Sequence, residues 1–596
     1  MLQLPRLRPS RFRSPGPGTD RRRPHGLPPV QWLSVAQLGR TAVEVVQASM
    51  FARFADEREA MANTPKLCYA LDRVADDTDV WIDYVADTGD GFDATFATAR
   101  CIAGAPDVSI TDRVGGEAAF PGRGARADLL VLGGDEVYPV ASAAAYTERL
   151  NRVLERATRA AGRTPGEANP PVLALPGNHD WYDSLASFRR NFCEAWVQRR
   201  PEGRSPELIS ELPHDDIGGW DAFQSRSYFA VRLRPGWWLW GLDSQLDAPF
   251  DAEQLAYFRD ARDLLEPDDD IVLCTATPCW LEAGGQEVYE PEPDTPLYTL
   301  LSFVDRILAG DERHRIRLVL TGDQHHYARY SSPAGPDLVT CGGGGAFLAS
   351  THHLPETLEI SWPEQDRTRR RTAYTLETEY PSRERSRELL SGGRFLAAGW
   401  SNGVGFPLFL GGVDFVLFLL GVHTFRLRSV PGWWLWLSLL VVGMVFLLIL
   451  AFAARGASEH LPGVRTRYTL GLALPHAAAH FALAGVPAWF VARSRPPGWY
   501  LLPVFAASCV LATLLVVTYL RIADRRDCHT LEAYSGLHIS DYKCHLRLQL
   551  GPELVRVHVV GIDRVPRTRH VPDPETVPLH ARIIETFEVA SRRASR

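Results

Sequence analysis

Short apolar runs that each end in a polar loop recur between residues 66 and 350. They read VWIDYVADTGDG, ADLLVLGGDEVYP, PPVLALPGNHDW, WWLWGLDSQLD, DIVLCTATPCW and IRLVLTGDQHHY. Runs that are apolar almost throughout are typical of strands covered on both faces. Because binding loops follow the carboxyl ends of such strands, the pattern predicts a layered α/β domain with its chemistry in those loops.

Four longer apolar stretches follow, each close to the roughly 20 residues that a helix needs to cross a bilayer. They are Phe406 to Val422, Trp433 to Ala453, Tyr468 to Val491 and Tyr500 to Leu520. The first contains Asp414 and the third contains His476 and His480, and polar groups in hydrocarbon are costly. We expect a four-helix transmembrane region, with buried helices of a soluble domain as the alternative.

The two histidines of the third stretch are four residues apart and therefore share a helix face. His476 and His480 could hold a metal ion, but packing or a polar contact between helices is the simpler expectation. Transport through the spans is a further possibility, although four helices are few for an alternating-access repeat.

The basic residues around the spans are unevenly distributed between the two sides. One side would carry Arg369, Arg370, Arg371, Arg394, Arg455, Arg465, Arg467, Arg521, Arg525 and Arg526, and the other Arg426, Arg428, Arg493 and Arg495. Since the more basic side faces the cytoplasm, we expect a multi-pass membrane protein whose large domain and C-terminal part are cytoplasmic.

The remaining segments complete the predicted domain organisation. Residues 1–60 form a basic, partly disordered region, 61–363 the catalytic domain, 364–404 a charged linker or exposed helix, 405–520 the transmembrane region and 521–596 a small β-rich unit. The last assignment rests on alternating apolar and polar residues on either side of Gly551 and Pro552, which indicate a β-hairpin.

Composition narrows the possible partners. The chain has 596 residues, too many for one ordinary core. Its net charge of -7 comes with no general basic field, which argues against a nucleic-acid partner. Its nine cysteines form no CxxC pair, so a reducing compartment is the simpler reading.

Candidate ligands for metal ions follow four of the apolar runs. They are Asp87, Asp135 with Tyr138, Asn178 with His179 and Asp180, and His325. Two metal ions held close together need a bridging carboxylate and a set of oxygen and imidazole donors, which strand-end loops can bring together. Asp87 and Asp135 could instead be turn residues at strand ends, and His325 alone would be an ordinary buried histidine.

The ordered combination of DTG at Asp87 to Gly89, GDEVY at Gly134 to Tyr138, GNHD at Gly177 to Asp180 and GDQHHY at Gly322 to Tyr327 resembles the calcineurin-like metallophosphoesterases. The closer likeness is to their purple acid phosphatase branch, and it spans about 240 residues. The resemblance implies an α/β/β/α sandwich that binds two metal ions, namely Fe, Mn or Zn. It stops before the apolar stretches.

The resemblance also implies roles for individual residues. Asp87, Asp135, Tyr138 and His325 would form the first metal site, and Asp135 would bridge to a second metal ion that Asn178 also binds. His179 would act as an acid or stabilise charge beside the phosphate, with Asp180 orienting it. His326 would lie on the substrate side.

Two positions depart from the family pattern. Ala276 and Asp323 stand where the family usually has histidines that bind the second metal ion. Asp323 can supply an oxygen ligand, whereas Ala276 supplies none, so the second site is expected to be weak. His352 and His353, after the glycine run that starts at Cys341, either border the pocket or lie on an exposed loop.

We therefore expect a membrane-anchored phosphoesterase that hydrolyses a phosphate mono- or diester with a metal-activated hydroxide. The alternative is a catalytically impaired binding or signalling protein that keeps the fold.

Overall fold

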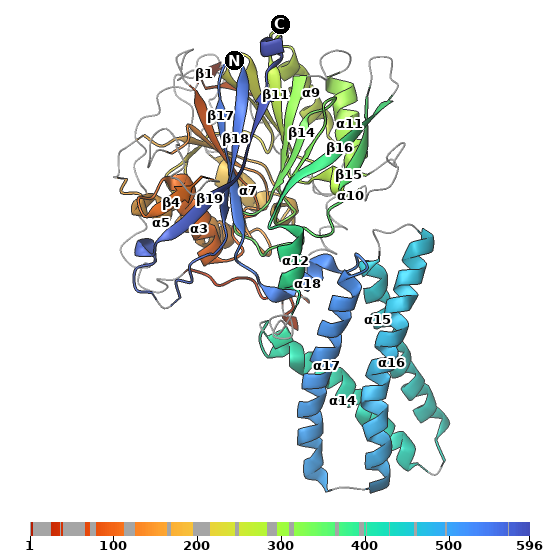
Figure 1. The fold of residues 1–596 in the computed structure, drawn as a ribbon. Coiled ribbons are helices and arrows are strands. Elements are labelled where there is room, and N and C mark those ends of the chain that lie inside the picture. The colour runs from red at the N-terminus through yellow and green to blue at the C-terminus, as the bar shows by residue number, and fades with distance from the viewer. Residues whose placement is uncertain are drawn as a thin grey trace. The chain divides into compact units, whose positions relative to one another are not determined.

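The computed structural model describes residues 2–3, 26–35, 37, 39, 66–71, 79–112, 126–163, 168–194, 215–244, 250–282, 295–308, 315–363, 369–391, 399–400, 402–427, 429–457, 462–494, 497–569 and 571–595. The chain divides into two compact units. The first comprises Met1–Val30, Val43–Ser382 and Ser540–Arg596, and the second comprises Gln31–Ala42 and Arg383–Ile539. The first is an α/β unit and the second is helical (Figure 1).

One nine-stranded mixed sheet carries three of the four candidate motifs. Its order is β4 (Val108–Thr111), β19 (Leu579–Ala590), β18 (Leu554–Ile562), β17 (Lys543–Leu550), β3 (Val80–Val85), β5 (Leu129–Leu132), β6 (Pro171–Ala174), β8 (Asp221–Ala222) and β7 (Asp215–Asp216). Strands β3, β5 and β6 are parallel neighbours, so the loops after them emerge at one edge.

The second sheet has ten strands and carries the fourth motif. Its order is β1 (Leu2–Gln3), β2 (Tyr69–Ala70), β9 (Phe229–Arg234), β10 (Trp237–Leu242), β11 (Asp270–Thr275), β12 (Ile316–Thr321), β14 (Asp337–Cys341), β13 (Tyr327–Ser331), β16 (Arg369–Tyr380) and β15 (Thr357–Pro363). Strands β10, β11, β12 and β14 are parallel, and the GDQHHY loop follows β12.

The two sheets pack face to face. Ile82 and Leu129 from the nine-stranded sheet share one apolar core with Val272 and Leu318 from the ten-stranded sheet. Alternate residues of the same strands, such as Leu130, point to the opposite face, because side chains alternate along a strand. Both faces of these strands are therefore buried, as their nearly continuous apolar runs predict.

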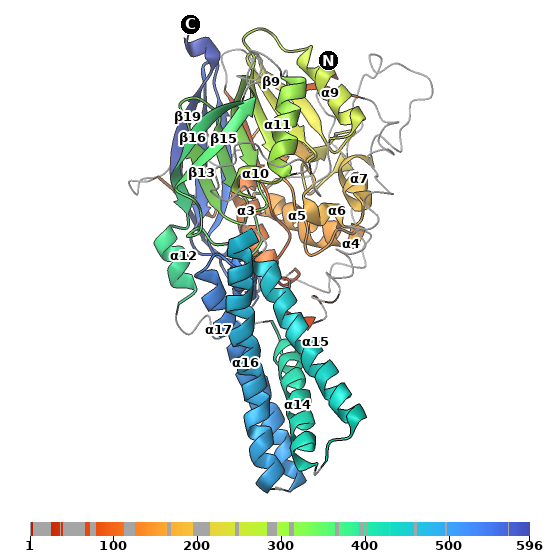
Figure 2. The same ribbon diagram turned by 90° about the vertical axis from the view of Figure 1, so that its right-hand side faces the viewer.

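Helices cover the outer face of each sheet. Helices α3 (Phe92–Ala103), α5 (Arg152–Ala160) and α7 (Ala186–Phe192) contribute to the core on the nine-stranded sheet. Helices α9 (Ala252–Arg262) and α11 (Pro296–Ile307) contribute to the core on the ten-stranded sheet. The unit is thus a sandwich of two sheets between layers of helices, and Figure 2 shows α9 and α11 in front of the strands.

The C-terminal hairpin belongs to this sandwich and does not form a sheet of its own. Strand β17 pairs antiparallel with β18 across the predicted turn, which confirms the hairpin. It also pairs antiparallel with β3, which lies more than 450 residues earlier. The separate C-terminal unit predicted from the sequence is therefore corrected. A lone hairpin would leave backbone N–H and C=O groups unpaired along its edges. Pairing with β3 gives the groups on one edge of β17 hydrogen-bond partners.

The predicted linker at 364–404 also contains a strand. Residues Arg369–Tyr380 form β16, which pairs with β13 and β15, and the short helix α12 (Arg383–Leu389) follows. Exposed residues such as Arg371 and Ala373 alternate with buried ones such as Thr372 and Tyr374 along β16. A charge-rich sequence hid this period-2 pattern, so the prediction of a linker or exposed helix is wrong for these residues.

The helical unit contains four helices that are long and apolar enough to cross a membrane. They are α14 (Gly405–Arg426), α15 (Gly432–Gly456), α16 (Pro462–Ser494) and α17 (Leu501–Asp524), followed by α18 (Thr530–Leu537). They match the four predicted spans. Apolar side chains face outward, with Trp436 73% and Leu440 68% exposed. This is the pattern of lipid-facing helices, and it disfavours the core of a soluble domain.

Most of the basic N-terminal region lies outside the described residues, and with it the predicted disorder. Within the described part, Leu2–Gln3 pairs in parallel with β2. The backbone N–H of Val30 donates to Asp90 in the loop after β3.

Candidate metal centre

Three aspartates at the strand ends share one backbone conformation. Asp87 follows β3, Asp135 follows β5 and Asp323 follows β12, with φ of 58°, 54° and 63°. Non-glycine residues seldom adopt positive φ, although aspartate tolerates it better than most. Such strained positions cluster at functional sites, and here each one turns the chain sharply at the end of a buried strand.

The hydroxyl of Tyr138 lies at the centre of the predicted ligand set. Its Oη is 2.9 Å from Oδ1 of Asp87, 3.1 Å from Oδ2 of Asp135 and 3.1 Å from Nε2 of His325. These residues come from three different loops, and His325 stands on the other sheet. The structure therefore brings together all four residues that the resemblance assigns to the first metal site.

Each carboxylate is anchored through one oxygen and presents the other to Tyr138. The backbone N–H of Asp323 donates to Oδ2 of Asp87 at 2.8 Å, and that of His179 donates to Oδ1 of Asp135 at 2.9 Å. The anchoring group comes from a different motif in each case. The motifs thus hold one another in position, as a preorganised ligand sphere requires.

Glycines make room for these carboxylates. A Cβ on Gly342 would lie 2.4 Å from Oδ2 of Asp87, and a Cβ on Gly177 would lie 2.1 Å from Oδ1 of Asp135. Gly342 begins the predicted glycine run, so one wall of the site is backbone. Only glycine permits so close an approach of the main chain.

The electrostatics of the cluster favour a bound cation. Asp87 and Asp135 are buried, with 0% and 3% of their surface exposed. Burial raises the pKa of both, and the repulsion between neighbouring carboxylates raises it further. Among the described residues no lysine or arginine donates a hydrogen bond to either carboxylate. A positive ion between them would remove this penalty.

The donor set fits a hard or borderline metal ion. Two carboxylates, a phenol and an imidazole are oxygen and nitrogen ligands of the type that Fe, Mn and Zn accept. Donors that share an ion at about 2.0 to 2.2 Å stand roughly 3 Å from one another, which agrees with the three distances around Tyr138. The ligand atoms of Asp87, Asp135 and His325 do not all lie within 4.8 Å of one another, so these residues and Tyr138 could hold one ion only if the carboxylates and the imidazole draw closer together.

Asn178 and His179 open helix α6 (Asn178–Trp181), directly after β6. The side-chain carbonyl oxygen of Asn178 is buried and accepts no hydrogen bond from the described residues, which leaves it available as a ligand. Both side chains are only partly buried, unlike that of Asp87.

The ring of His179 is oriented by a backbone carbonyl. Its Nδ1 lies 2.6 Å from the carbonyl oxygen of Pro139, and burial lowers the pKa of His179 to about 4. Asp180 instead accepts from the N–H groups of Gly177 and Glu136 and from the hydroxyl of Tyr146. The carboxylate of Asp180 thus braces the GNHD loop, and its role in orienting His179 stays a prediction.

The predicted second metal site would have few ligands. Ala276 is 2% exposed, and a Cβ on Gly134 would lie 3.0 Å from its methyl group, so this ligand-free side chain sits beside the GDEVY loop. Asp323 is partly exposed, and burial raises the pKa of its carboxyl to about 6. A second ion would rest on Asp135, Asn178 and Asp323, all oxygen donors.

His326 is buried, not open to a substrate. It is 2% exposed, and both ring nitrogens lack hydrogen-bond partners among the described residues. Its predicted place on the substrate side is therefore corrected. His325 and His326 lie in the bend directly before β13, which begins at Tyr327.

The structure adds residues that the motifs did not indicate. The ring of Phe347 packs edge-on against His325 with centroids 4.5 Å apart, and the N–H of Ala346 donates to the carbonyl oxygen of Asp87 at 2.8 Å. The ammonium of Lys543 on β17 donates to the carbonyl oxygen of Ala346. The glycine run before Ala346 was the only sequence signal for this wall.

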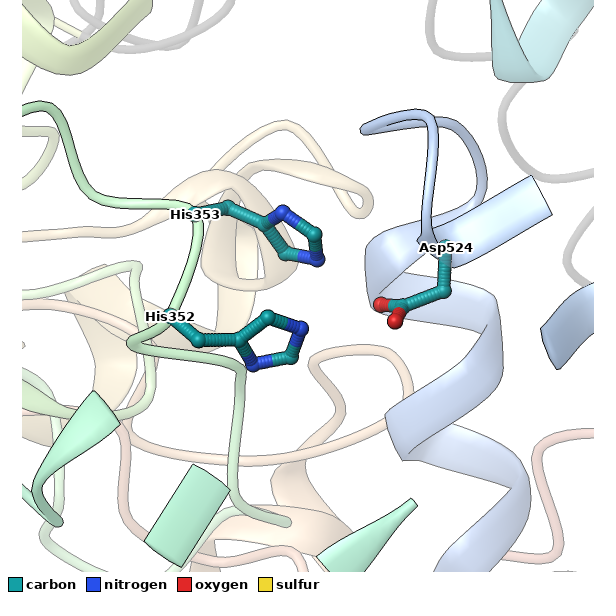
Figure 3. A group of neighbouring side chains, drawn as sticks. All are labelled: His352, His353 and Asp524. Atoms are coloured by element: carbon teal, nitrogen blue, oxygen red, sulfur yellow. The ribbon is translucent and has the colours of Figure 1, made fainter. Parts of the chain in front are cut away.

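The imidazoles of His352 and His353 lie side by side on the loop after β14, with ring centroids 3.9 Å apart (Figure 3). Both are half-buried. Asp524, also labelled in Figure 3, ends helix α17 of the helical unit. Two imidazoles alone do not make a metal site, so we assign no ligand to the pair.

A scan against known protein families and a search of curated proteins find no match to this chain.

Proposed function

We propose that the chain is a multi-pass membrane protein whose α/β unit is a metal-dependent phosphoesterase acting on a phosphate mono- or diester. The observation that carries this proposal is the convergence of Asp87, Asp135 and His325 on the hydroxyl of Tyr138. The motif order, which resembles that of the calcineurin-like metallophosphoesterases, supports the same assignment. The arginine distribution supports a cytoplasmic position for this unit.

Bound metal ions would lower the pKa of a water molecule and withdraw negative charge from the phosphate. The protein's own contribution is to hold the ligands rigidly. Asp87 and Asp135 are fixed by backbone N–H groups, and Tyr138 is fixed by both carboxylates. Such preorganisation avoids rearrangement during the reaction.

His179 is the candidate for proton transfer to the leaving group. Its Nδ1 is held by the carbonyl oxygen of Pro139, so the ring donates there and Nε2 is left for the substrate. A buried imidazole with a low pKa is neutral near pH 7. In that form Nε2 carries no proton and accepts one, so transfer to the leaving group requires the protonated ring. The negative substrate would raise the pKa of His179 on binding and so favour that protonated form.

A second candidate function is binding or signalling without turnover. Ala276 favours it, because a side chain without a ligand atom lies at the position where a second imidazole would be needed. A single ion would still bind phosphate, but the clamp provided by two ions would be lost.

The test is hydrolysis of a generic aryl phosphate monoester and a generic bis-aryl diester by the purified full chain. Metal content is first determined by elemental analysis, and the metal-free protein is then supplied with Fe, Mn or Zn. Metal-dependent hydrolysis of either ester supports the enzyme. Bound metal without hydrolysis of any ester favours the binding protein.

Asp135→Asn tests the proposed ligand, because the amide keeps the size of the side chain and removes its charge. We expect kcat to fall by more than about 100-fold, since changes outside the direct ligands already cost about 10- to 100-fold. Asp183→Asn removes a nearby carboxylate that braces Ser187, outside the ligand set, and should leave the hydrolysis rate nearly unchanged. Equal rates for Asp135→Asn and the wild type would overturn the assignment.

A further inference from the structure

A carboxylate and an imidazole meet inside the apolar helical unit. Asp414 lies near the middle of α14, and Nδ1 of His480 on α16 is 2.8 Å and 3.0 Å from its two carboxylate oxygens. Their exposed fractions are 1% and 6%. Ionisable groups at such depth in a transmembrane helix are costly and mark functional positions.

The contacts continue from this pair along the bundle. His476 lies one turn earlier on α16, and its ring centroid is 4.6 Å from that of His480. The ring centroid of Tyr519 on α17 lies 4.4 Å from that of His476. The ring centroid of His529 lies 5.6 Å from that of Tyr519. Three helices and the bend before α18 thus contribute to one line of titratable side chains.

The line ends at Glu532, which is partly exposed and lies near both His529 and Arg455. Nδ1 of His529 is 3.5 Å from the carboxylate of Glu532 at the start of α18. Arg455 of α15 approaches the same carboxylate at 4.0 Å, and the side chains of Glu532 and Arg455 are 31% and 80% exposed. The line therefore leads from a buried carboxylate to an end of the bundle that water can reach.

Two members of the line have buried polar atoms without partners. The hydroxyl of Tyr519 and Nε2 of His529 form no hydrogen bond to any described residue. By contrast, Ser508 and Thr513 donate to carbonyl groups of their own helix. Buried water commonly joins such unsatisfied atoms, and here it would connect neighbouring rings.

Close helix packing holds the line in place. A Cβ on Gly411, one turn before Asp414, would lie 2.4 Å from Cys509 of α17, so the two helices touch through their backbones. A Cβ on Gly456 would lie 2.2 Å from the ring of His529. Small residues let helices approach in this way within membranes.

A metal ion does not explain the arrangement. A metal site needs several ligand atoms around one point, whereas these groups follow one another along the bundle. Among the described residues, Asp414, His476 and His480 do not bring three ligand atoms within 4.8 Å of one another.

The opposite half of the bundle offers no continuation. Between Asp414 and His423, α14 has only apolar residues, and α16 has no carboxylate, imidazole or phenol between His480 and its end at Ser494. The described residues of α15 before Arg455 and of α17 before Tyr519 have none either. The carboxylate is thus connected to one side only.

We propose that the helical unit contains a one-sided proton pathway that connects Glu532 with Asp414. The charged and titratable groups around it are Asp414, Arg455, His476, His480, Tyr519, Asp524, His529 and Glu532. A proton that enters a ring at one nitrogen is balanced by one that leaves from the other nitrogen. After each transfer the rings have exchanged tautomers, and Asp414 has gained one proton.

The pathway is tested on the full chain in phosphatidylcholine vesicles by time-resolved infrared spectroscopy after a pH jump. The carbonyl stretch of protonated Asp414 is identified by its loss in Asp414→Asn. A tag at the C-terminus reports the side of Glu532, because the described residues after α17 include no candidate span. We expect the band to respond to a pH jump on that side and not to one on the other.

Two variants interrupt the line and one serves as control. Tyr519→Phe removes only the unpartnered hydroxyl, and His476→Leu removes a ring, so both should slow the response by at least about tenfold. His423→Leu changes an exposed imidazole at the other end of the bundle and should leave the rate unchanged. Three outcomes would each overturn the proposal. They are wild-type rates in both Tyr519→Phe and His476→Leu, an equal response to pH jumps on either side, and the absence of an Asp414 band between about pH 4 and about pH 9. The pair would then serve only to join α14 and α16.

Discussion

The hydroxyl of Tyr138 and Nε2 of His325 lie 3.1 Å apart, although 187 residues separate them in the chain. One follows a strand of the nine-stranded sheet and the other follows a strand of the ten-stranded sheet. This contact places the proposed metal centre between the strand ends of two packed sheets. Its integrity therefore depends on the packing of the whole α/β unit.

Tyr138→Phe should reduce metal binding without unfolding the protein. The substitution removes one ligand atom and keeps the ring, which packs against His179 with centroids 4.4 Å apart. We expect metal affinity to fall by about tenfold or more. Elemental analysis and a hydrolysis assay across metal concentrations measure the change. Unaltered affinity would show that the phenol oxygen is not a ligand.

Gly342→Ala should disturb the centre from its backbone side. The added methyl group would lie 2.4 Å from Oδ2 of Asp87, so the carboxylate must move. We expect a loss of activity of about tenfold or more, because small displacements of catalytic groups are costly. Gly551→Ala is the control, since its methyl group would lie 3.4 Å from its nearest neighbour. Equal activity of the two variants would contradict the crowding argument.

Ala276→His should strengthen the second metal site. The new imidazole would stand beside the GDEVY loop, next to the predicted bridging ligand Asp135. We expect the number of metal ions bound per chain to rise and hydrolysis to accelerate, because a second ion stabilises the attacking and leaving oxygens together. Titration with Mn or Zn followed by elemental analysis measures the number. No change in either quantity would show that position 276 does not limit the site.

Breaking the ion pair between Arg547 and Asp83 should destabilise the α/β unit. The guanidinium donates two hydrogen bonds of 2.7 Å each to the carboxylate, and both side chains are buried at directly opposed positions of β17 and β3. Arg547→Leu leaves the carboxylate without this partner and should cost about 3 to 5 kcal/mol. Chemical denaturation of the full chain in detergent measures the loss.

The double variant Asp83→Asn with Arg547→Leu tests the same pair. It removes the buried charge as well, so most of the lost stability should return. If the double variant were as unstable as the sum of the two single variants, the ion pair would not be the cause.

The contribution of His545 to the stability of the α/β unit should be lost as the pH is lowered from about 6.5 to about 4. His545 on β17 is 1% exposed, and burial lowers its pKa to about 4. The unfolded chain binds a proton at this residue below about pH 6.5, whereas the folded chain stays neutral until about pH 4. The contribution of His545, roughly 3 kcal/mol at most, is present above this window and is lost as the pH falls through it. Denaturation of the wild type and of His545→Leu over this range should show that the stability of the wild type relative to the variant falls as the pH is lowered.

The local features of the fold were predictable from the sequence. The apolar runs that became β3, β5, β6, β11 and β12 are buried on both faces, and the four membrane-length helices follow their apolar stretches. These patterns depend on residues that are close together in the chain. The motif loops also end up where a parallel sheet places them, at the carboxyl ends of its strands.

Charge-rich strands were harder to recognise. Residues 369–380 seemed too polar for a strand, and only pairing with β13 and β15 makes β16 part of the sheet. Likewise, the C-terminal hairpin could be identified by its alternation, but its pairing with β3 depends on a partner more than 450 residues away. Long-range pairing has no local signal.

By itself, the sequence determined which residues could bind a metal ion, because the motifs name the ligand types and the strand pattern places them in loops. The tertiary structure decided how they are held. It assigned the orientation of His179 to the carbonyl oxygen of Pro139, buried His326, and joined Asp414 to His480 within the bundle. Every residue has the same backbone carbonyl, so the sequence does not show which one a side chain will contact. Side-chain contacts between distant elements form only when the core packs, so these relationships could not be predicted from the sequence.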